Sequence, residues 1–268
     1  MSSLTYPSVS LIVSTYNWPE ALNLCLISIS KQVVLPDEVI IADDGSTEET
    51  RKLIEKFQLN FPVPLIHVWQ EDDGFQLSRI RNKAIARAKK DYIIQIDGDL
   101  ILERHFVKDH LKFCEKGTFV SGSRVIMDKK LSEALLKEGR TKVYLSTKGL
   151  VNVLNGLRIS FLAAYMNGYK KNDIYYLRGC NMAFWRDDLI KVNGYNEAFA
   201  GWGREDNEIG LRLINSGIEK RIIKFSGIVF HIYHPEKPRN KVNINDEILK
   251  QTAKDKLRYC EKGLSQYE

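Results

Sequence analysis

The chain has 268 residues, of which 44% are hydrophobic and 28% charged, with 17 glycines and 7 prolines. This composition is typical of a globular protein of one or two domains and excludes a disordered, collagen-like or membrane-spanning chain. The net charge of +6 would suit nucleic acid, an anionic membrane or a phosphorylated substrate. Basic and acidic residues are mixed in stretches such as 51–56, however, which favours an ordinary solvated surface.

The four cysteines, Cys25, Cys114, Cys180 and Cys260, lie far apart and form no CxxC pair. We therefore expect free thiols and a reducing compartment. The first ten residues lack the basic and apolar regions of a signal peptide, and polar residues interrupt the most apolar long stretch, 149–169. The sequence predicts a cytoplasmic protein, and peripheral contact with the inner face of a membrane stays open.

In the first half of the chain, short runs rich in Val, Ile and aromatic residues alternate with amphipathic segments. The expected strands are 9–13, 38–42, 65–69, 92–96 and 119–121. The expected helices are 19–32, 48–57 with Thr47 as its N-cap, 77–88 and 104–114. This alternation predicts an α/β fold with a mostly parallel central sheet and helices on both faces. Such sheets bind ligands at the carboxyl ends of their strands.

The residues that follow the first expected strand, 14–19, contain neither GxGxxG nor GxxxxGK[ST]. A dinucleotide or P-loop site is therefore not expected. From 125 to 176 the pattern is the hardest to interpret, because lysines are scattered among apolar residues. A motif-rich block follows from 178 to 234, and a helical pattern runs from 246 to 258.

Paired carboxylates follow two of the expected strands. Asp43 and Asp44 stand at the end of one strand, where they form either an Asx-type turn before a helix or a contact to a nucleobase or ribose. Asp97 and Asp99 follow another and would lie on one side if the strand continues through them. Like charges at a strand end repel unless a cation lies between them, and carboxylate oxygens suit Mg²⁺ or Mn²⁺. We therefore favour a metal site at Asp97 and Asp99.

Between these motifs, Gln76 precedes an expected helix that carries Arg79, Arg81 and Asn82. The helix presents either an ordinary basic face or a nucleotide contact. In the second case an arginine would pair with phosphate oxygens and Asn82 would hold a ribose or base.

The second half contains a Gly-Trp-Gly segment before a strongly acidic helix start. The helix dipole alone would explain acidic residues at Glu205, Asp206 and Glu208. Flexible glycines beside Trp202 favour a further role, because an indole face can bind the apolar side of a sugar ring.

Two histidines follow the β-like run 228–230. His231 and His234 are two of only five histidines in the chain, and their spacing makes them candidate ligands that complete the metal site of Asp99.

Taken together, these blocks resemble the family 2 glycosyltransferases of GT-A fold. The similarity is greatest to the bacterial chondroitin-polymerase type, with a C-terminal block like that of galactosyltransferases. The blocks occur in the family's order at 9–17, 43–46, 74–82, 92–99, 178–184 and 201–208. The resemblance implies a metal-dependent, inverting transfer of a hexose or N-acetylhexosamine from a UDP-sugar to a hydroxyl of a saccharide or lipid-linked acceptor. It also implies a place in surface polysaccharide synthesis.

The resemblance also implies roles for individual residues. Nucleotide-sugar binding is implied for Thr15, Tyr16, Asn17, Asp43, Asp44, Gln76, Arg81, Asn82 and Asp97. Binding of Mn²⁺ or Mg²⁺ is implied for Asp97, Asp99, His231 and His234, with either histidine as the ligand. Asp206 is implied as the catalytic base, Glu205 as its catalytic neighbour, and Trp202, Asn181 and Arg178 as contacts to acceptor or sugar.

On this basis we expect a nucleotide-sugar-binding half over 1–123, a variable acceptor-side segment over 124–177 and a catalytic and acceptor half over 178–268. UDP-GalNAc, UDP-Gal, UDP-GlcNAc and UDP-GlcA all remain open as donors. Arg204 departs from the small residue that galactosyltransferases have at this position. The alternatives are a sugar-phosphate nucleotidyltransferase and a non-catalytic sugar- or nucleotide-binding module.

Overall fold

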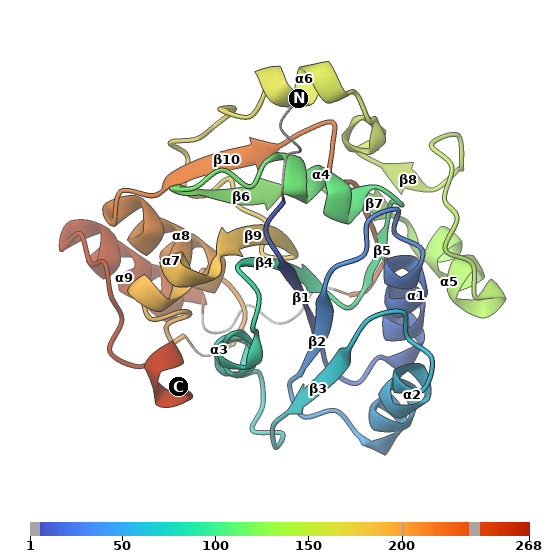
Figure 1. Ribbon diagram of the computed structural model, residues 1–268, viewed down its shortest axis with the longest axis horizontal. Helices are drawn as coiled ribbons and strands as arrows, with labels where there is room; N and C mark the ends of the chain where they lie inside the picture. Colours follow the sequence, from blue (N-terminus) through green and yellow to red (C-terminus); the bar gives the residue numbers. More distant parts are fainter. Residues whose placement is uncertain (1–5, 200, 236–241) are drawn as a thin grey trace.

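The computed structural model describes residues 6–199, 201–235 and 242–268. In these residues the strands form a seven-stranded sheet and a smaller four-stranded sheet (Figure 1). The large sheet has the strand order β10 (Glu219–Ile223), β6 (Thr118–Gly122), β9 (Asn181–Trp185), β4 (Tyr92–Asp97), β1 (Val9–Thr15), β2 (Glu38–Asp43) and β3 (Leu65–Trp69). The five expected strands correspond to β1, β2, β3, β4 and β6.

One strand of the large sheet runs against the others. β9 pairs antiparallel with β4 and with β6, whereas the remaining neighbours are parallel. The sequence did not predict this strand, although its five residues are all buried. β9 belongs to the second half of the chain yet lies between strands of the first half, so the two halves share one sheet. The division of the chain at 123 and 178 stays a prediction.

Helices cover both faces of this sheet. α1 (Pro19–Ser30), α2 (Glu48–Gln58) and α4 (Phe106–Lys112) supply apolar side chains to the core on one face. α3 (Leu77–Arg87), α7 (Arg186–Lys191) and α8 (Glu205–Asn215) do so on the other. The expected α/β architecture with a mostly parallel sheet is thereby confirmed.

The boundaries of two helices differ from the expectation. α4 is shorter than 104–114, because the Glu103 carboxylate accepts the N–H of His105 in a turn that delays the start of the helix. Thr47 precedes α2 in an extended conformation, but its side chain makes no capping hydrogen bond within the described residues. The final long helix, α9, spans Val242–Lys254 rather than 246–258.

The small sheet joins the segment 125–151 to the rest of the molecule. Its strands are β5 (Leu100–Leu102), β11 (Val229–His231), β7 (Val125–Met127) and β8 (Leu150–Val151), in this order. Apolar residues of α1, of these strands and of α5 (Lys129–Glu138) form its core. The register places His231 beside Leu100, immediately after the turn that follows β4. The small sheet therefore brings the end of β11 to the carboxyl edge of the large sheet.

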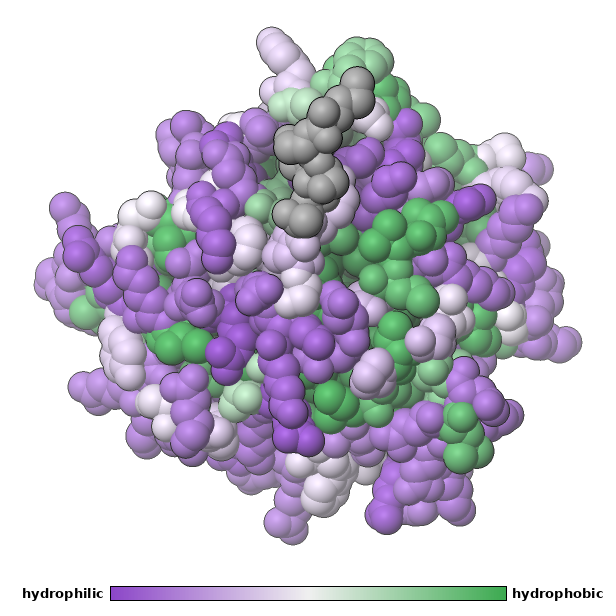
Figure 2. Space-filling view, viewed as in Figure 1, coloured by the Kyte–Doolittle hydropathy of each residue, from purple (hydrophilic) through white to green (hydrophobic). Residues whose placement is uncertain are grey.

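The segment after β8 contains a short 3-10 helix, Val153–Gly156, and α6 (Ser160–Tyr165). Phe161 and Tyr165 on α6 are 76% and 85% exposed. Figure 2 shows hydrophilic residues over most of one face of the molecule, with a hydrophobic area at the upper edge over α6. None of the described helices is long and apolar enough to cross a membrane.

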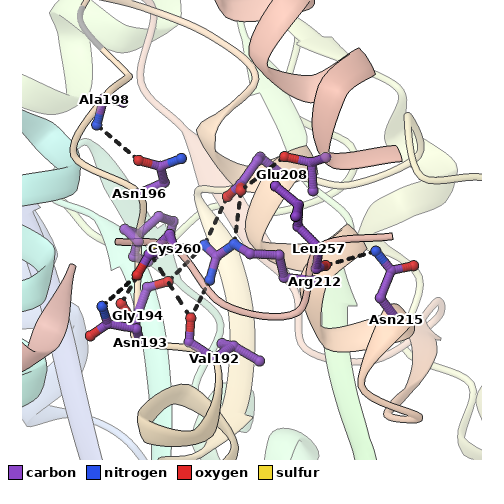
Figure 3. A network of polar contacts seen from close by, with 12 residues as sticks. Val192, Asn193, Gly194, Asn196, Ala198, Glu208, Arg212, Asn215, Leu257 and Cys260 are labelled. Carbon is purple, nitrogen blue, oxygen red and sulfur yellow. Dashed lines mark hydrogen bonds and ion pairs between the residues drawn. The ribbon is translucent and has the colours of Figure 1, made fainter. Parts of the chain in front are cut away.

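A buried ion pair within α8 fixes an arginine that joins this helix to the loop 192–194 (Figure 3). The Arg212 guanidinium pairs with the Glu208 carboxylate at 2.7 Å and donates to the carbonyls of Val192 and Gly194. The Asn193 amide donates to the Cys260 carbonyl at 2.6 Å, which fixes the C-terminal segment on the same loop. These contacts hold α8 in place. All four cysteines are free thiols, as expected, and Cys114 alone is only half-buried.

Candidate active site

Asp43, the first of the two carboxylates at the end of β2, forms hydrogen bonds within the protein. Asp43 is fully buried; its Oδ1 accepts the N–H of Ser46 at 2.8 Å, and its Oδ2 lies 2.9 Å from His67 Nε2. This is the Asx-type turn that the sequence left open. Both oxygens have partners inside the protein, although a carboxylate oxygen can accept more than one hydrogen bond. A contact of Asp43 to the nucleotide stays a prediction. His67 was not singled out from the sequence, where it is one residue of an apolar strand.

Asp44 draws the following loop against β2. Its Oδ1 accepts the Gln70 amide at 2.6 Å, and its Oδ2 accepts the backbone N–H of Gln76 at 3.0 Å. Gly45 makes this approach possible, because a Cβ there would lie 2.6 Å from the Cα of Asp72. Asp44 and Gln76 are thus brought together as expected, whereas Gln70 was missed.

The residues after β1 form a rim beside this loop. Thr15 is buried at the strand end, while Tyr16 is 42% exposed and its hydroxyl donates to Asp72 at 2.9 Å. Asn17 has a φ of 46°, and its side-chain oxygen accepts the N–H of Thr47 at 2.8 Å. The expected nucleotide-binding residues Thr15, Tyr16 and Asn17 therefore lie beside Asp44 and Gln76.

Arg81 lies at the centre of the site. It is 1% exposed, and its guanidinium joins Asp206 at 2.9 Å to Asp97 at 3.2 Å while donating to Ser14 Oγ at 3.3 Å. The resemblance implied a nucleotide contact for Arg81, which stays a prediction; in the structure its partners are two carboxylates and a hydroxyl. A guanidinium can hold two carboxylates at fixed positions because its donors form a rigid plane.

The ring of Tyr195 lies against Arg81, with the guanidinium carbon 5.2 Å from the ring centre. The Tyr195 hydroxyl donates to Gln95 Oε1 at 2.9 Å, and Gln95 Nε2 donates to the Gly179 carbonyl at 3.1 Å. Sequence reasoning missed both residues. Gln95 could have been found from the sequence, because it is a polar residue in the middle of an otherwise apolar strand.

Asn82 fixes the loop that carries Tyr195. It is fully buried; its amide nitrogen donates to the Tyr195 carbonyl and to Glu197, both at 2.8 Å, and its oxygen accepts the Tyr195 N–H at 2.7 Å. A contact of Asn82 to the nucleotide stays a prediction.

Asp206 stands in the first turn of α8 and approaches the backbone before β9. A Cβ on Gly179 would lie 1.6 Å from Asp206 Oδ2, so only glycine allows the carboxylate to occupy this position. The Asp206 side chain is 20% exposed. The close approach explains the glycine of the Arg178–Phe184 block.

Glu205, the neighbour of Asp206, is buried to 7% exposure, and its Oε2 makes no hydrogen bond within the described residues. Burial and, second, the charge of Asp206 raise the pKa of Glu205 to about 8. At neutral pH Glu205 therefore carries a proton and can donate a hydrogen bond.

Three side chains at the junction of the two sheets could hold a metal ion. Potential ligand atoms of Asp99, His231 and His234 all lie within 4.8 Å of one another. Asp99 Oδ2 is 3.6 Å from His231 Nε2 and 3.3 Å from His234 Nε2, whereas Asp99 Oδ1 is buried with no hydrogen-bond partner in the described chain. This donor set of one carboxylate and two imidazoles fits Mn²⁺, and Asp99 Oδ1 is a buried carboxylate oxygen of the kind that binds such an ion.

Asp97 and Asp99 do not lie in one continuous strand. β4 ends at Asp97, and a turn at 98–99 precedes β5. The alternation argument therefore fails: Asp97 pairs with Arg81 and Asp99 faces the histidines. Burial raises the pKa of Asp97 to about 6, although the Arg81 charge opposes this. The expectation that Asp97 is a metal ligand stays a prediction.

The three expected acceptor contacts differ in their surroundings. Arg178 is exposed over the ring of Tyr176, and Trp202 is 42% exposed. Asn181 is fully buried; its oxygen lies 2.9 Å from His110 Nε2, and its nitrogen donates to the carbonyls of Ser123 and Gly227. These contacts join the start of β9 to α4 and to the residues that precede β7 and β11. A contact of Asn181 to a sugar stays a prediction.

Comparisons with known proteins agree with this geometry. A family model described as glycosyl transferase family 2 matches residues 10–192, and one described as the N-terminal domain of galactosyltransferase matches residues 160–235. The chain is 26% identical over 281 aligned positions to a chondroitin synthase of Pasteurella multocida. The match covers 96% of this chain but only 28% of that relative.

Two solved structures share the fold. A mannosyltransferase of Pyrobaculum calidifontis, in complex with GDP-Man and Mn²⁺, matches 94% of this chain and 65% of its own, with 18% identity and a TM-score of 0.63. TarS of S. aureus, in complex with UDP-GlcNAc, matches 97% of this chain and 69% of its own, with 15% identity and a TM-score of 0.65. These likenesses confirm the GT-A fold.

Proposed function

Because the chain belongs to glycosyl transferase family 2, we propose that it transfers a sugar from a UDP-sugar to a hydroxyl of a saccharide or lipid-linked acceptor, with inversion and with a divalent metal ion. The proposal includes a role in surface polysaccharide synthesis, in line with the chondroitin synthase relative. Family membership makes the chain a glycosyltransferase, so a nucleotidyltransferase or a non-catalytic module is no longer needed to explain the motifs.

One observation carries the proposal. Arg81 joins Asp206, the carboxylate of the second half, to Asp97 at the end of β4. Asp97 lies two residues before Asp99, which faces His231 and His234. These contacts support the proposal that Asp206, as the proton acceptor, and the metal-binding groups border one site. Inverting transfer needs these two functions on opposite sides of the sugar.

Asp99, His231 and His234 would hold the metal ion, which when bound neutralises the charge of a diphosphate leaving group. The UDP part of the donor would lie along the carboxyl ends of β1 and β2, next to Tyr16 and Asp44. TarS, solved with UDP-GlcNAc, and the mannosyltransferase, solved with GDP-Man and Mn²⁺, support a nucleotide-sugar donor and a metal ion here.

The neighbouring acids Asp206 and Glu205 would have different roles in the reaction. Asp206 accepts the proton of the acceptor hydroxyl as that oxygen attacks the anomeric carbon. Glu205, which is protonated at neutral pH, donates a hydrogen bond to a substrate oxygen and does not compete for the proton. Arg81 keeps Asp206 in position and limits the repulsion between Asp206 and Asp97.

A panel of nucleotide sugars tests the proposal without knowledge of the acceptor. Slow hydrolysis of one UDP-sugar, dependent on Mn²⁺ and releasing UDP, is the expected result. With an acceptor, NMR of the product should show a β linkage from an α-linked donor. No binding or hydrolysis of any UDP-sugar, or a product that retains the α configuration, would contradict the proposal.

A further inference from the structure

A row of aromatic rings and cations lies on the segment that the sequence left without a role. Arg204 lies over the ring of Tyr175 at 5.2 Å, Arg178 and Lys170 over Tyr176 at 5.4 and 4.6 Å, and Lys224 over Tyr169 at 4.8 Å. The Tyr169 and Tyr176 rings contact each other edge to face at 5.6 Å. We call these residues the ladder: Arg204, Tyr175, Arg178, Tyr176, Lys170, Tyr169 and Lys224.

The ladder begins at the catalytic helix. Arg204 directly precedes Glu205, and an ion pair to Asp246 at 2.5 Å anchors it. The Asn207 amide donates to the Ile174 carbonyl at 2.7 Å, so the loop that carries the tyrosines runs along the first turn of α8. A molecule that reaches Asp206 from this side would therefore pass over the ladder.

The loop beneath the ladder is held by the protein. Lys220, which is 1% exposed, donates to the carbonyls of Asp173 and Tyr176. The N–H of Arg178 donates to Ser121 Oγ at 3.0 Å. Tyr175 is nevertheless 57% exposed, and Lys170 and Arg178 are exposed as well. Tyr175, Lys170 and Arg178 are thus the part of the ladder that a ligand can reach, on a loop that the protein holds in place.

The surrounding segment is strongly basic. Residues 140–176 contain six basic residues and one acidic residue, in a chain whose net charge is only +6. Three of these six, Arg140, Arg158 and Lys171, form ion pairs with Glu138, Asp109 and Glu219, whereas Lys170 belongs to the ladder and adds to the charge of Arg178 and Lys224. Charge complementarity indicates an anionic partner here.

We propose that the ladder binds the growing end of an anionic glycan and presents its terminal hydroxyl to Asp206. This inference rests on the proposed function and specifies its acceptor class. The tyrosine rings would contact the apolar faces of sugar rings, while the cations bind carboxylates or phosphodiesters along the chain. An anionic membrane would also meet the basic charge, but it would not explain why the row starts at the catalytic carboxylates.

The direct test measures binding without donor. We expect the protein to bind a fluorescent octasaccharide of alternating glucuronic acid and N-acetylhexosamine, or a ribitol phosphate oligomer. The tighter of the two ligands identifies the anion. Affinity should fall as salt is raised, and a neutral β-glucan octasaccharide should bind at least about fivefold more weakly, because it lacks the charges that the cations would pair with.

Two adjacent lysines supply a matched pair of variants. Lys170→Gln removes a ladder cation, whereas Lys171→Gln removes the same charge from a side chain that pairs with Glu219 at 3.0 Å. We expect Lys170→Gln to weaken binding of the anionic oligosaccharide about fivefold and to raise the acceptor KM more than it changes kcat. Lys171→Gln should change affinity less than twofold, because its charge is already paired and screened.

Each outcome separates this inference from the proposed function. If the protein hydrolyses a UDP-sugar but binds no anionic oligosaccharide better than the neutral one, the ladder proposal is wrong and the proposed function stands. Equal effects of the two lysine variants would also overturn it, since general charge would then suffice. Binding to vesicles of anionic phospholipid, lost in Lys170→Gln while oligosaccharides do not bind, would replace the glycan by a membrane.

Discussion

The Asp206 carboxylate lies directly against the backbone of Gly179, where a methyl group would come within 1.6 Å of Asp206 Oδ2. Gly179 lies just before β9, and its carbonyl accepts the amide of Gln95 from the neighbouring strand. The position of Asp206 therefore depends on the central sheet as well as on its own helix.

Gly179→Ala should displace Asp206 and its partner Arg81 by the width of a methyl group. Because a misplacement of about 1 Å can cost a factor of about 100 in rate, we expect transfer to fall by roughly that factor. UDP binding should change little. Gly168→Ala is the control, since a Cβ there has no heavy atom within 4 Å among the residues that the structure describes. Equal rates in the two variants would show that Gly179 does not position Asp206.

Much of the fold could be predicted from the sequence, because hydrophobic alternation and turn residues mark β1 to β4 and their helices locally. β9 could not, since its buried pattern decides neither its direction nor its place between β4 and β6. The expected β-like run 228–230 corresponds to β11, but the rest of the small sheet was missed for a related reason: β5 and β7 have three residues each and pair across long sequence separations.

Part of the candidate site could be predicted because its residue types are uncommon at the ends of strands. Asp99, His231 and His234 meet as expected, because carboxylates and histidines after strands are unusual. Asn82 and Asn181 were interpreted as ligand contacts, and this stays a prediction; the structure shows that both hydrogen-bond to backbone groups inside the protein. A polar residue in a motif block can serve either a ligand or a buried backbone group, and only the tertiary contacts distinguish these uses.

The proposed metal site of Asp99, His231 and His234 leads to a prediction about nucleotide affinity. If Asp99 holds the cation with a histidine, UDP should bind at least about tenfold more weakly in EDTA, and Asp99→Ala should match that loss at saturating Mn²⁺. Single changes of His231 and His234 to Ala, measured by calorimetry with UDP and Mn²⁺, identify the histidine ligand. His105→Ala is the control, because His105 pairs with Glu103 instead. UDP affinity that is indifferent to EDTA would contradict the site.

Glu205 should make the stability of the protein depend on pH. Its pKa rises from 4.5 to about 8 on folding, chiefly through burial, so the folded state binds more protons between these values. Protonated Glu205 contributes to the free energy of unfolding. This contribution is fully present below pH 4.5 and is lost as the pH rises through about 8. Glu205→Gln mimics the protonated acid and should be more stable than the parent at pH 8.5, by on the order of a few kcal/mol.

The measurement is urea unfolding of both proteins from pH 5 to 9. Other groups near Glu205, among them Asp97 and Arg81, are present in parent and variant alike, so the difference between the two curves reports mainly on Glu205. Parallel curves would mean that Glu205 titrates normally.

The buried pair of Figure 3 predicts a stability difference between two ion pairs of the same spacing. Glu208→Ala leaves the Arg212 guanidinium, which is fully buried, without its countercharge and should cost about 3 to 5 kcal/mol. Glu55→Ala breaks the corresponding pair with Arg51. The side chains of Arg51 and Glu55 are 60% and 56% exposed, so this change should cost less than about 1 kcal/mol. Similar losses in urea unfolding would refute the anchoring role of the pair.

The proposed catalytic base, Asp206, gives the last prediction. Asp206→Asn keeps the size of the side chain and a hydrogen-bond acceptor for Arg81, but it removes the carboxylate that we propose as the acceptor of the proton. General-base catalysis is worth about 10² to 10⁴-fold, so transfer should fall by at least about 100-fold. UDP binding with Mn²⁺ should stay near the parent level, because Asp206 is not one of the proposed metal ligands. Glu205→Gln should lose less activity, since Glu205 is already protonated at neutral pH and glutamine still donates a hydrogen bond. A variant Asp206→Asn with more than about a tenth of the parent rate, or a larger loss in Glu205→Gln, would assign the proton transfer to another group.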